Sequence, residues 1–343
     1  MRPDVIVVGA GVAGLACARG LVDAGARVQV LDRARGVGGR CATRHVDGLA
    51  IDFGVIFLHG VSKEFTDCVE SVEGTSVLRD WPLRRHDSGT PCQPDAFAAG
   101  SRRFAYGDGL SALPKHLARG LDVELKTEVT AIQAVGGLMQ ATTIDGRSFA
   151  APSLVLALAP EQTRRLLATL TTKVTDVSSA EAMMALFASA PCVTVLAGYP
   201  AGTPEPPWDV SYPSDSPVLM LMSNESSKRQ NRPYNALVYQ STPRWSRTHL
   251  EDSASALQAA ILAEAGHRLG SWAAAPTWAQ VHVWHYARLD RGNELARPLL
   301  VALADGARLG IAGEIFAPGG GVEAAWTSGR ALAARLIAKE EHA

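Results

Sequence analysis

The residues with the clearest chemical meaning in this sequence are three glycines near its start, Gly9, Gly11 and Gly14, spaced as G-x-G-x-x-G. They follow a short apolar run, residues 4–8, that predicts a buried parallel strand. In a strand–turn–helix unit this spacing lets the backbone approach a pyrophosphate at the helix N-terminus. Asp32 ends the predicted second strand, where a carboxylate accepts a hydrogen bond from a ribose 2′-OH. The pattern predicts a dinucleotide site that favours an unphosphorylated ribose.

A second glycine group follows the acid and is not needed for an ordinary nicotinamide site. Gly36, Gly38 and Gly39 are flanked by Arg35 and Arg40. Backbone N–H groups and guanidinium groups of this kind are typical phosphate partners. Two interpretations remain open for the segment alone, a larger dinucleotide ligand or a flexible surface loop.

The order of these residues resembles the FAD-binding N-terminus of the flavin-containing amine oxidase superfamily. The resemblance rests on Asp32, the run Gly38-Gly39-Arg40, Thr43 and the triplet Asp52-Phe53-Gly54. It implies that noncovalently bound FAD is the cofactor, and that the second glycine group follows the FAD pyrophosphate toward the flavin. The cofactor contacts that it implies are Gly9, Gly11, Ala13, Gly14, Asp32, Arg33, Gly38, Gly39, Arg40, Val129, Gly313, Glu314 and Val322.

Four further stretches resemble the renalase-like branch of that superfamily, residues 226–229, 237–251, 281–289 and 313–329. The resemblance implies an FAD-dependent oxidoreductase that takes hydride from a small substrate, such as misreduced dihydro-NAD(P) isomers, onto flavin N5. Oxygen would then reoxidise the flavin, with formation of peroxide.

One departure from the renalase-like pattern concerns the substrate side. That pattern places Gly-Ala-Gln after the aspartate, whereas this chain has Gly54, Val55 and Ile56. An isoleucine removes a polar group, which predicts a more apolar pocket. The alternatives are therefore an amine oxidase or desaturase acting on an apolar metabolite, or a non-catalytic FAD-binding protein.

The predicted substrate pocket consists of Ile56, Phe57, His59, Trp284 and Tyr286. Trp284 and Tyr286 alternate along a strand-like run and share one of its faces. They could form an aromatic wall beside the flavin, or they could pack in a core. No catalytic residue is assigned, because correct placement of substrate over the flavin suffices for hydride transfer.

The elements that must position these residues predict an α/β fold. We expect a Rossmann-type, glutathione-reductase-like FAD domain with an inserted substrate domain built on a mixed or antiparallel sheet. The predicted FAD domain comprises residues 1–60, 102–160 and 293–343, and the predicted substrate domain residues 61–101 and 161–292.

Several elements of these domains can be predicted individually. Residues 15–24 predict the helix after the first glycine turn. Residues 123–126, 129–135 and 140–144 predict a small β-meander. A helix over 324–339 would follow a third glycine turn and direct its N-terminal dipole at the flavin.

Composition restricts the class of partner. The 343 residues are 47% hydrophobic and carry a net charge of −1, which favours neither nucleic acid nor an anionic membrane. Five dispersed cysteines without a C-x-x-C pair predict neither disulfides nor a metal site, and favour a reducing, cytoplasmic compartment. No secretion signal is expected, and the uncharged run 182–199 predicts buried core elements. The expected partners are a small-molecule substrate and oxygen.

Overall fold

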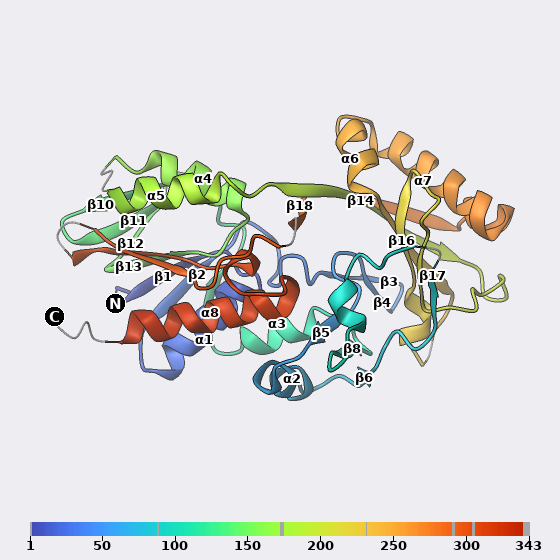
Figure 1. Cartoon of the computed structure of the whole chain (residues 1–343), viewed down its shortest axis with the longest axis horizontal. Coiled ribbons are helices and arrows are strands. Elements are labelled where there is room, and N and C mark those ends of the chain that lie inside the picture. Colours follow the sequence, from blue (N-terminus) through green and yellow to red (C-terminus); the bar gives the residue numbers. More distant parts are fainter. Residues whose placement is uncertain are drawn as a thin grey trace. The chain divides into compact units, whose positions relative to one another are not determined.

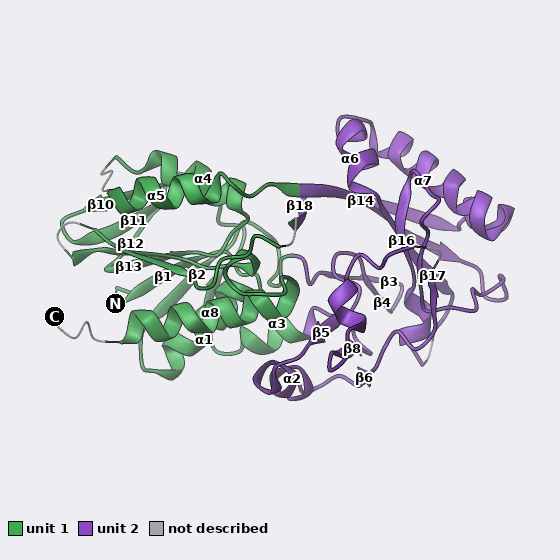
Figure 2. Ribbon diagram, viewed as in Figure 1, with its two compact units in different colours: residues 1–39, 113–189, 289–343 green, residues 40–112, 190–288 purple. Residues whose placement is uncertain are grey.

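The computed structural model describes residues 2–87, 89–171, 175–230, 232–289, 292–303 and 306–338. The chain forms two compact units, which Figure 2 distinguishes by colour. Unit 1 comprises Met1–Gly39, Leu113–Ser189 and Leu289–Ala343, and unit 2 comprises Arg40–Ala112 and Ala190–Arg288. Each unit is assembled from segments that are far apart in the sequence.

Unit 1 is built on a six-stranded sheet in the order β19-β20-β13-β1-β2-β9. All neighbouring strands are parallel except β19 and β20, which are antiparallel. The strands are β1 (Val5–Val8), β2 (Val28–Leu31), β9 (Asp122–Glu124), β13 (Ser153–Leu156), β19 (Leu299–Ala302) and β20 (Arg308–Ile311). Every residue of β1 and β13 is buried, as expected for parallel strands covered on both faces.

Helices and a second small sheet cover the two faces of the unit 1 sheet. Figure 1 shows α1 and α8 on one side, and the three-stranded sheet β10-β11-β12 with α4 and α5 on the other. The helices are α1 (Val12–Asp23), α4 (Pro160–Thr169), α5 (Thr175–Met184) and α8 (Gly321–Ile337), and the strands are β10 (Val129–Val135), β11 (Leu138–Thr143) and β12 (Ser148–Ala151). Gly329 of α8 lies against the Ala13 carbonyl of α1, where a Cβ atom would collide. Small residues thus bring these two helices into close contact.

Unit 2 is built on a six-stranded sheet in the order β18-β14-β17-β16-β15-β7. Its strands are β7 (Arg85–Asp87), β14 (Ser189–Tyr199), β15 (Val210–Tyr212), β16 (Leu219–Asn224), β17 (Asn235–Ser241) and β18 (Trp278–Leu289). One face packs on helix α7 (Ala254–Leu269), with Tyr199, Tyr239 and Ile261 buried among the residues of that core. The helix α6 (Pro243–His249) lies at the same side of the sheet in Figure 1.

The opposite face of this sheet packs on the segment that follows the second glycine group. Phe53, Ile56 and Phe57 form one apolar core with Leu196, Leu221 and Val238 of the sheet. Unit 2 also contains the hairpin β3 (Thr43–Val46) and β4 (Leu49–Asp52), the strands β5 (Leu58–Gly60), β6 (Val77–Arg79) and β8 (Arg102–Tyr106), and the helix α2 (Lys63–Glu70). The helix α3 (Ala112–Leu117) belongs to unit 1 from Leu113 onward. One face of the mixed sheet therefore fixes residues 52–57.

The predicted fold class is confirmed, since a Rossmann-type sheet and a mixed sheet of inserted segments are both present. The boundaries of the compact units differ from those of the predicted domains. Residues 40–60 and 102–112 of the predicted FAD domain fall in unit 2, and residues 161–189 of the predicted substrate domain fall in unit 1. The assignment of a cofactor domain and a substrate domain stays a prediction.

Two local predictions need correction. Strand β9, within the predicted meander, instead pairs with β2 in the large parallel sheet, and the meander is β10-β11-β12. The last helix begins at Gly321, three residues before the predicted start.

The run 182–199 contains the end of α5 and strand β14. Within the described part of the chain, no helix combines the length and apolar character needed to cross a membrane.

Candidate functional site

The first glycine turn connects β1 to α1 in unit 1, and its three glycines face different surroundings. A Cβ atom at Gly9 would lie 2.5 Å from the Ala157 carbonyl oxygen, and one at Gly14 would collide with the Gly9 carbonyl. A Cβ atom at Gly11 would meet nothing within 4 Å. Gly9 and Gly14 are thus required by packing, whereas Gly11 faces open space at the N-terminus of α1. That space fits the approach of a pyrophosphate to backbone N–H groups.

The second glycine group lies directly against the first. The Gly38 N–H donates to the Ala10 carbonyl at 2.8 Å, and Gly38 pairs with Gly11 in a parallel bridge. Gly39 has a φ of +54°, in the left-handed region that favours glycine. The structure therefore brings together two glycine turns that the sequence separates. These residues fit an extended dinucleotide, which supports the predicted role of both groups.

Asp32 ties the end of β2 to the first glycine turn. Its carboxylate accepts hydrogen bonds from the Ala10 N–H at 2.6 Å and the Ala34 N–H at 2.7 Å. A carboxylate has capacity for further donors, so these bonds leave room for a ribose hydroxyl. Arg33 is exposed and lies 3.9 Å from Glu128, and nothing else in the structure assigns it a cofactor contact.

The last predicted cofactor residues lie around the third glycine turn of unit 1. The Gly313 N–H donates to the Ser328 hydroxyl at 3.1 Å. The Glu314 carboxylate accepts from the Gly321 N–H at 3.2 Å, so it bonds one of the N–H groups that begin α8. Val322 is partly buried in the first turn of α8, and Val129 packs against the unit 1 core at the start of β10. The roles of these residues toward FAD stay predictions.

In unit 2, Arg40 and Gly54 hold two chain segments in contact. The Arg40 carbonyl accepts from the Val55 N–H at 2.8 Å, and a Cβ atom at Gly54 would collide with that same carbonyl. The Arg40 guanidinium donates to the Ala287 carbonyl at 3.4 Å. Glycine at position 54 is therefore needed for the close packing of the 52–57 segment on Arg40.

An aromatic group on β18 lies against the 52–57 segment. The Trp284 indole N–H donates to the Phe53 carbonyl at 3.1 Å, and the two rings stack with centroids 5.4 Å apart. The His282 ring meets the Trp284 ring edge-on at 4.2 Å. Burial, together with the charge of Arg44, lowers the pKa of His282 to about 4, so its imidazole is neutral at pH 7. Tyr286 is partly buried two residues further along the strand.

Ile56 and Phe57 lie in the unit 2 core, with exposed fractions of 0% and 1%. Trp81 and Phe97 meet the Phe57 ring edge-on. His59 is half-buried on β5, with its ring 6.4 Å from that of Phe57. The role of these side chains in a substrate pocket stays a prediction, and Ile56 has no exposed surface with which to line one.

An Ile56→Gln variant tests the place of this side chain. We expect a loss of about 2–4 kcal/mol in the free energy of unfolding, because an amide without a partner would replace apolar contacts. Chemical denaturation measures the loss. Ile144→Gln is the matched control, since Ile144 is 72% exposed and its replacement should leave the denaturation midpoint unchanged. Wild-type stability together with faster oxidation of dihydronicotinamide isomers would instead place position 56 beside the flavin.

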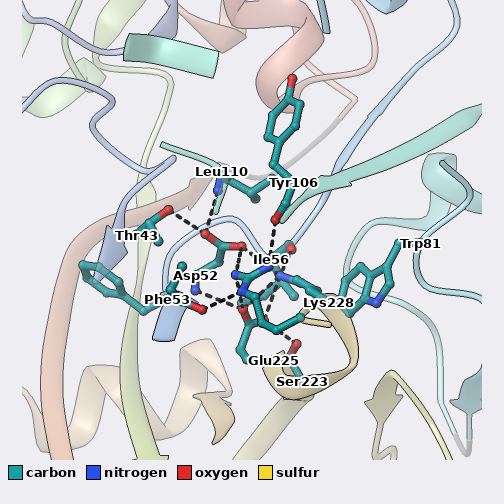
Figure 3. Close-up of polar contacts among 12 residues, drawn as sticks. Thr43, Asp52, Phe53, Ile56, Trp81, Tyr106, Leu110, Ser223, Glu225 and Lys228 are labelled. Atoms are coloured by element: carbon teal, nitrogen blue, oxygen red, sulfur yellow. Dashed lines mark hydrogen bonds and ion pairs between the residues drawn. The ribbon is translucent and has the colours of Figure 1, made fainter. Parts of the chain in front are cut away.

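Beneath the 52–57 segment lies a buried charge cluster, formed by Asp52, Glu225, Lys228 and Arg229 (Figure 3). The side chains of the first three have no exposed surface, and that of Arg229 is 4% exposed. The Lys228 ammonium lies 3.0 Å from the Asp52 carboxylate and 2.8 Å from that of Glu225. It also donates to the Ile56 carbonyl at 2.5 Å, which links the cluster to the segment above it.

Hydrogen bonds satisfy the remaining groups of the cluster. The Asp52 carboxylate accepts from the Thr43 hydroxyl at 2.6 Å and the Leu110 N–H at 2.7 Å. Burial acts to raise the pKa of Asp52, but Lys228 and Arg229 hold that pKa below its ordinary value. Asp52 is thus ionised at neutral pH, and its charge is balanced inside the protein.

The sequence interpretation did not assign a role to the charges of this cluster. Asp52 and the run 226–229 contributed only to the resemblance, because lysine and arginine beside serines are usually exposed. A signal was available in the sequence, since Asp52 follows the apolar strand residues Leu49 and Ile51. An acid that ends a buried strand needs a buried partner.

Two family models match the chain. The first, an NAD(P)-binding Rossmann-like domain, matches residues 7–71. The second, the flavin containing amine oxidoreductase, matches residues 77–337.

Curated relatives are similar over a short stretch. Probable polyamine oxidase 4 of Arabidopsis thaliana is 45% identical over 64 residues, which are 19% of this chain and 13% of that protein. Polyamine oxidase 4 of Oryza sativa subsp. japonica is 47% identical over 62 residues, which are 18% of this chain and 13% of that protein. The matched stretch therefore spans about an eighth of the length of these relatives.

Solved structures share the fold over nearly the whole chain. A putrescine oxidase described as bound to putrescine has a TM-score of 0.71 and 16% identity, with 99% of this chain and 100% of that chain covered. Cyclohexylamine oxidase from Brevibacterium oxydans IH-35A has a TM-score of 0.74 and 14% identity, with 98% and 99% covered. Because the second family model spans well over half of the residues, the chain belongs to the family of flavin-containing amine oxidoreductases, and FAD as cofactor and oxidoreductase as enzyme class are those of its family.

Proposed function

We propose that this protein oxidises the carbon–nitrogen bond of a small amine, with FAD as the acceptor of hydride and oxygen as the final acceptor. The observation that carries the proposal is the match to the flavin-containing amine oxidoreductase model over residues 77–337. The polyamine oxidases that match a stretch of 62 to 64 residues also support amine oxidation. The open space at Gly11 supports noncovalent binding of the FAD pyrophosphate in unit 1.

The residues of this chain would supply binding and orientation. The N–H groups at the start of α1 and of the second glycine turn would hold the pyrophosphate, and Asp32 would accept a ribose hydroxyl. When bound, FAD supplies a two-electron acceptor at N5 of its flavin. The neutral imidazole of His282 adds no positive charge beside Phe53 and Trp284.

The proposed reaction balances with water and oxygen as the other reactants. The substrate carbon gives up a hydride and its nitrogen a proton, and the product is an imine. Water then converts the imine to a carbonyl compound and releases the amine or ammonia. Oxygen takes up the two electrons with two protons and leaves as hydrogen peroxide.

A turnover assay in air tests this proposal. Purified protein is supplied with a panel of primary and secondary amines, and peroxide and carbonyl product are quantified. We expect the two products in equal amounts with at least one class of amine. A Gly11→Val preparation, which should contain less FAD, should form both products more slowly in proportion to its FAD content. Peroxide without a carbonyl product, or no peroxide with any amine, would reject amine oxidation.

A second candidate substrate is a misreduced dihydro-NAD(P) isomer, and one observation favours it. Three of the stretches that carry the renalase-like resemblance each donate a side-chain hydrogen bond to a backbone carbonyl of residues 52–57. Lys228 bonds Ile56, Gln240 bonds Gly54 and Trp284 bonds Phe53. In the same assay, peroxide formed only from a borohydride-generated mixture of dihydro-NAD isomers would select this candidate. If neither substrate class gives peroxide, the remaining alternative is an FAD-binding protein that catalyses no reaction.

A further inference from the structure

The guanidinium of Arg288, near the end of β18, is held by neutral groups. It donates to the Gln240 side-chain oxygen at 3.1 Å and to the Cys92 carbonyl at 3.4 Å. The residue is partly buried. Among the residues that the structure describes, none offers it a carboxylate within ion-pair distance.

The pairing of Arg288 differs from that of the most deeply buried cations of this unit. Lys228 and Arg229 each face a carboxylate, whereas Arg288, like the partly buried Arg44, faces neutral groups. Placing a charge in a low-dielectric environment is costly unless an opposite charge balances it. A guanidinium also has more N–H donors than two acceptors can use. An anion from outside the chain would satisfy both requirements of Arg288.

Arg288 is separated from the 52–57 segment by one side chain. The Gln240 amide N–H donates to the Gly54 carbonyl at 2.7 Å, while its oxygen accepts from Arg288. Gly54 itself is packed so closely on Arg40 that no Cβ atom fits. The guanidinium is therefore fixed relative to the 52–57 segment, which contains two residues of the predicted substrate pocket, Ile56 and Phe57.

We propose that Arg288 binds an anionic group of the substrate, a carboxylate or a phosphate. This inference rests on the proposed function and specifies its substrate class, an electron-donating compound that also carries a negative charge. Guanidinium groups bind both anions through paired N–H donors. A diamine such as putrescine, which carries two positive charges at neutral pH, would be repelled by Arg288.

Binding of small anions to the FAD-loaded protein tests the assignment without turnover. Benzoate, phenyl phosphate and the neutral analogue benzamide are titrated while the absorbance of the bound flavin is followed. We expect at least one anion to bind at least tenfold more tightly than benzamide. Tighter binding of benzoate points to a carboxylate substrate, and tighter binding of phenyl phosphate to a phosphate ester. Equal affinity for all three, or no binding of either anion, would overturn the proposal.

Variants of Arg288 separate recognition from a structural role. We expect Arg288→Met to weaken binding of the preferred anion at least tenfold, and Arg288→Lys to weaken it less, because the charge remains. Arg79→Met is the matched control, since Arg79 lies in the same unit and pairs with Glu70 through a side chain that is 59% exposed. Its anion affinity should stay within about threefold of wild type. Equal losses in Arg288→Met and Arg79→Met would overturn a specific role for Arg288.

Two outcomes distinguish this inference from the proposed function. If Arg288→Met does not retain FAD, two measurements still test whether Arg288 binds an anion. They are the anion affinity of Arg288→Lys and the comparison of the anions with benzamide on wild-type protein. Selective anion binding without peroxide formation would support the anion-binding role of Arg288 and reject amine oxidation. Peroxide formation from amines without selective anion binding would reject only the anion-binding role of Arg288.

Discussion

A Gly11→Val variant is expected to fold normally and to lose at least about 100-fold in FAD affinity, or about 2.7 kcal/mol of binding free energy. The backbone at Gly11 has φ −74° and ψ 176°, which a valine adopts without strain. Its side chain would enter the open space that a pyrophosphate should occupy. The ratio of flavin to protein absorbance after purification measures the loss of FAD, and thermal unfolding of the apoprotein measures the fold.

Gly14→Val is the matched control for this prediction. A Cβ atom at Gly14 would collide with the Gly9 carbonyl and lie 3.1 Å from the Ala157 side chain. This variant should therefore lose the fold of unit 1 as well as FAD. Full loading of the Gly11→Val variant with FAD would contradict the place assigned to the pyrophosphate.

The second large effect is expected from Lys228→Met, which should lower the free energy of unfolding by about 3–5 kcal/mol. The variant leaves the carboxylates of Asp52 and Glu225 buried, with Arg229 as the remaining cation of the buried charge cluster. It also removes the donor that the Ile56 carbonyl accepts. Chemical denaturation followed by circular dichroism gives the change in stability.

Lys63→Met provides the control for loss of a lysine ion pair. Lys63 pairs with Asp67 at 2.6 Å, but its side chain is 83% exposed, so its removal should leave the denaturation midpoint unchanged. Wild-type stability of Lys228→Met would show that the buried charge cluster does not stabilise the fold. Recovery of stability in a Lys228→Arg variant would show that a buried cation at this position is what matters.

The elements of unit 1 that carry the glycine turns could be predicted because their signals are local. Strand β1, the first glycine turn and Asp32 follow one another within a single strand–turn–helix–strand unit. The pairing of Gly11 with Gly38 could be expected only from the family resemblance, since no local pattern brings two glycine turns together. Strand β9 pairs with β2 and not within the predicted meander, because a short strand pattern does not specify its partner.

In unit 2, the sequence indicated which residues mattered but not how they pair. The run 226–229 contributes to the family resemblance, yet Asp52, the partner of Lys228, lies more than 170 positions earlier. A place for Ile56 in a substrate pocket stays a prediction, and what the structure adds is that its side chain is buried and its carbonyl accepts a hydrogen bond from Lys228. The Gln240 contacts that join Arg288 to Gly54 likewise connect three segments distant in sequence. Long-range polar pairing of this kind has no periodicity from which it could be predicted.

The anaerobic absorbance spectrum of the FAD-loaded protein, recorded before and after addition of substrate, shows directly whether the substrate reduces the flavin. Oxygen is absent, so any loss of oxidised-flavin absorbance reports electrons that pass from substrate to FAD. We expect complete loss of this absorbance with an amine that carries an anionic group, at one molecule of substrate oxidised per flavin. An oxidised spectrum that persists with every amine and with dihydro-NAD isomers, while dithionite reduces the flavin, would contradict an oxidoreductase acting on either class.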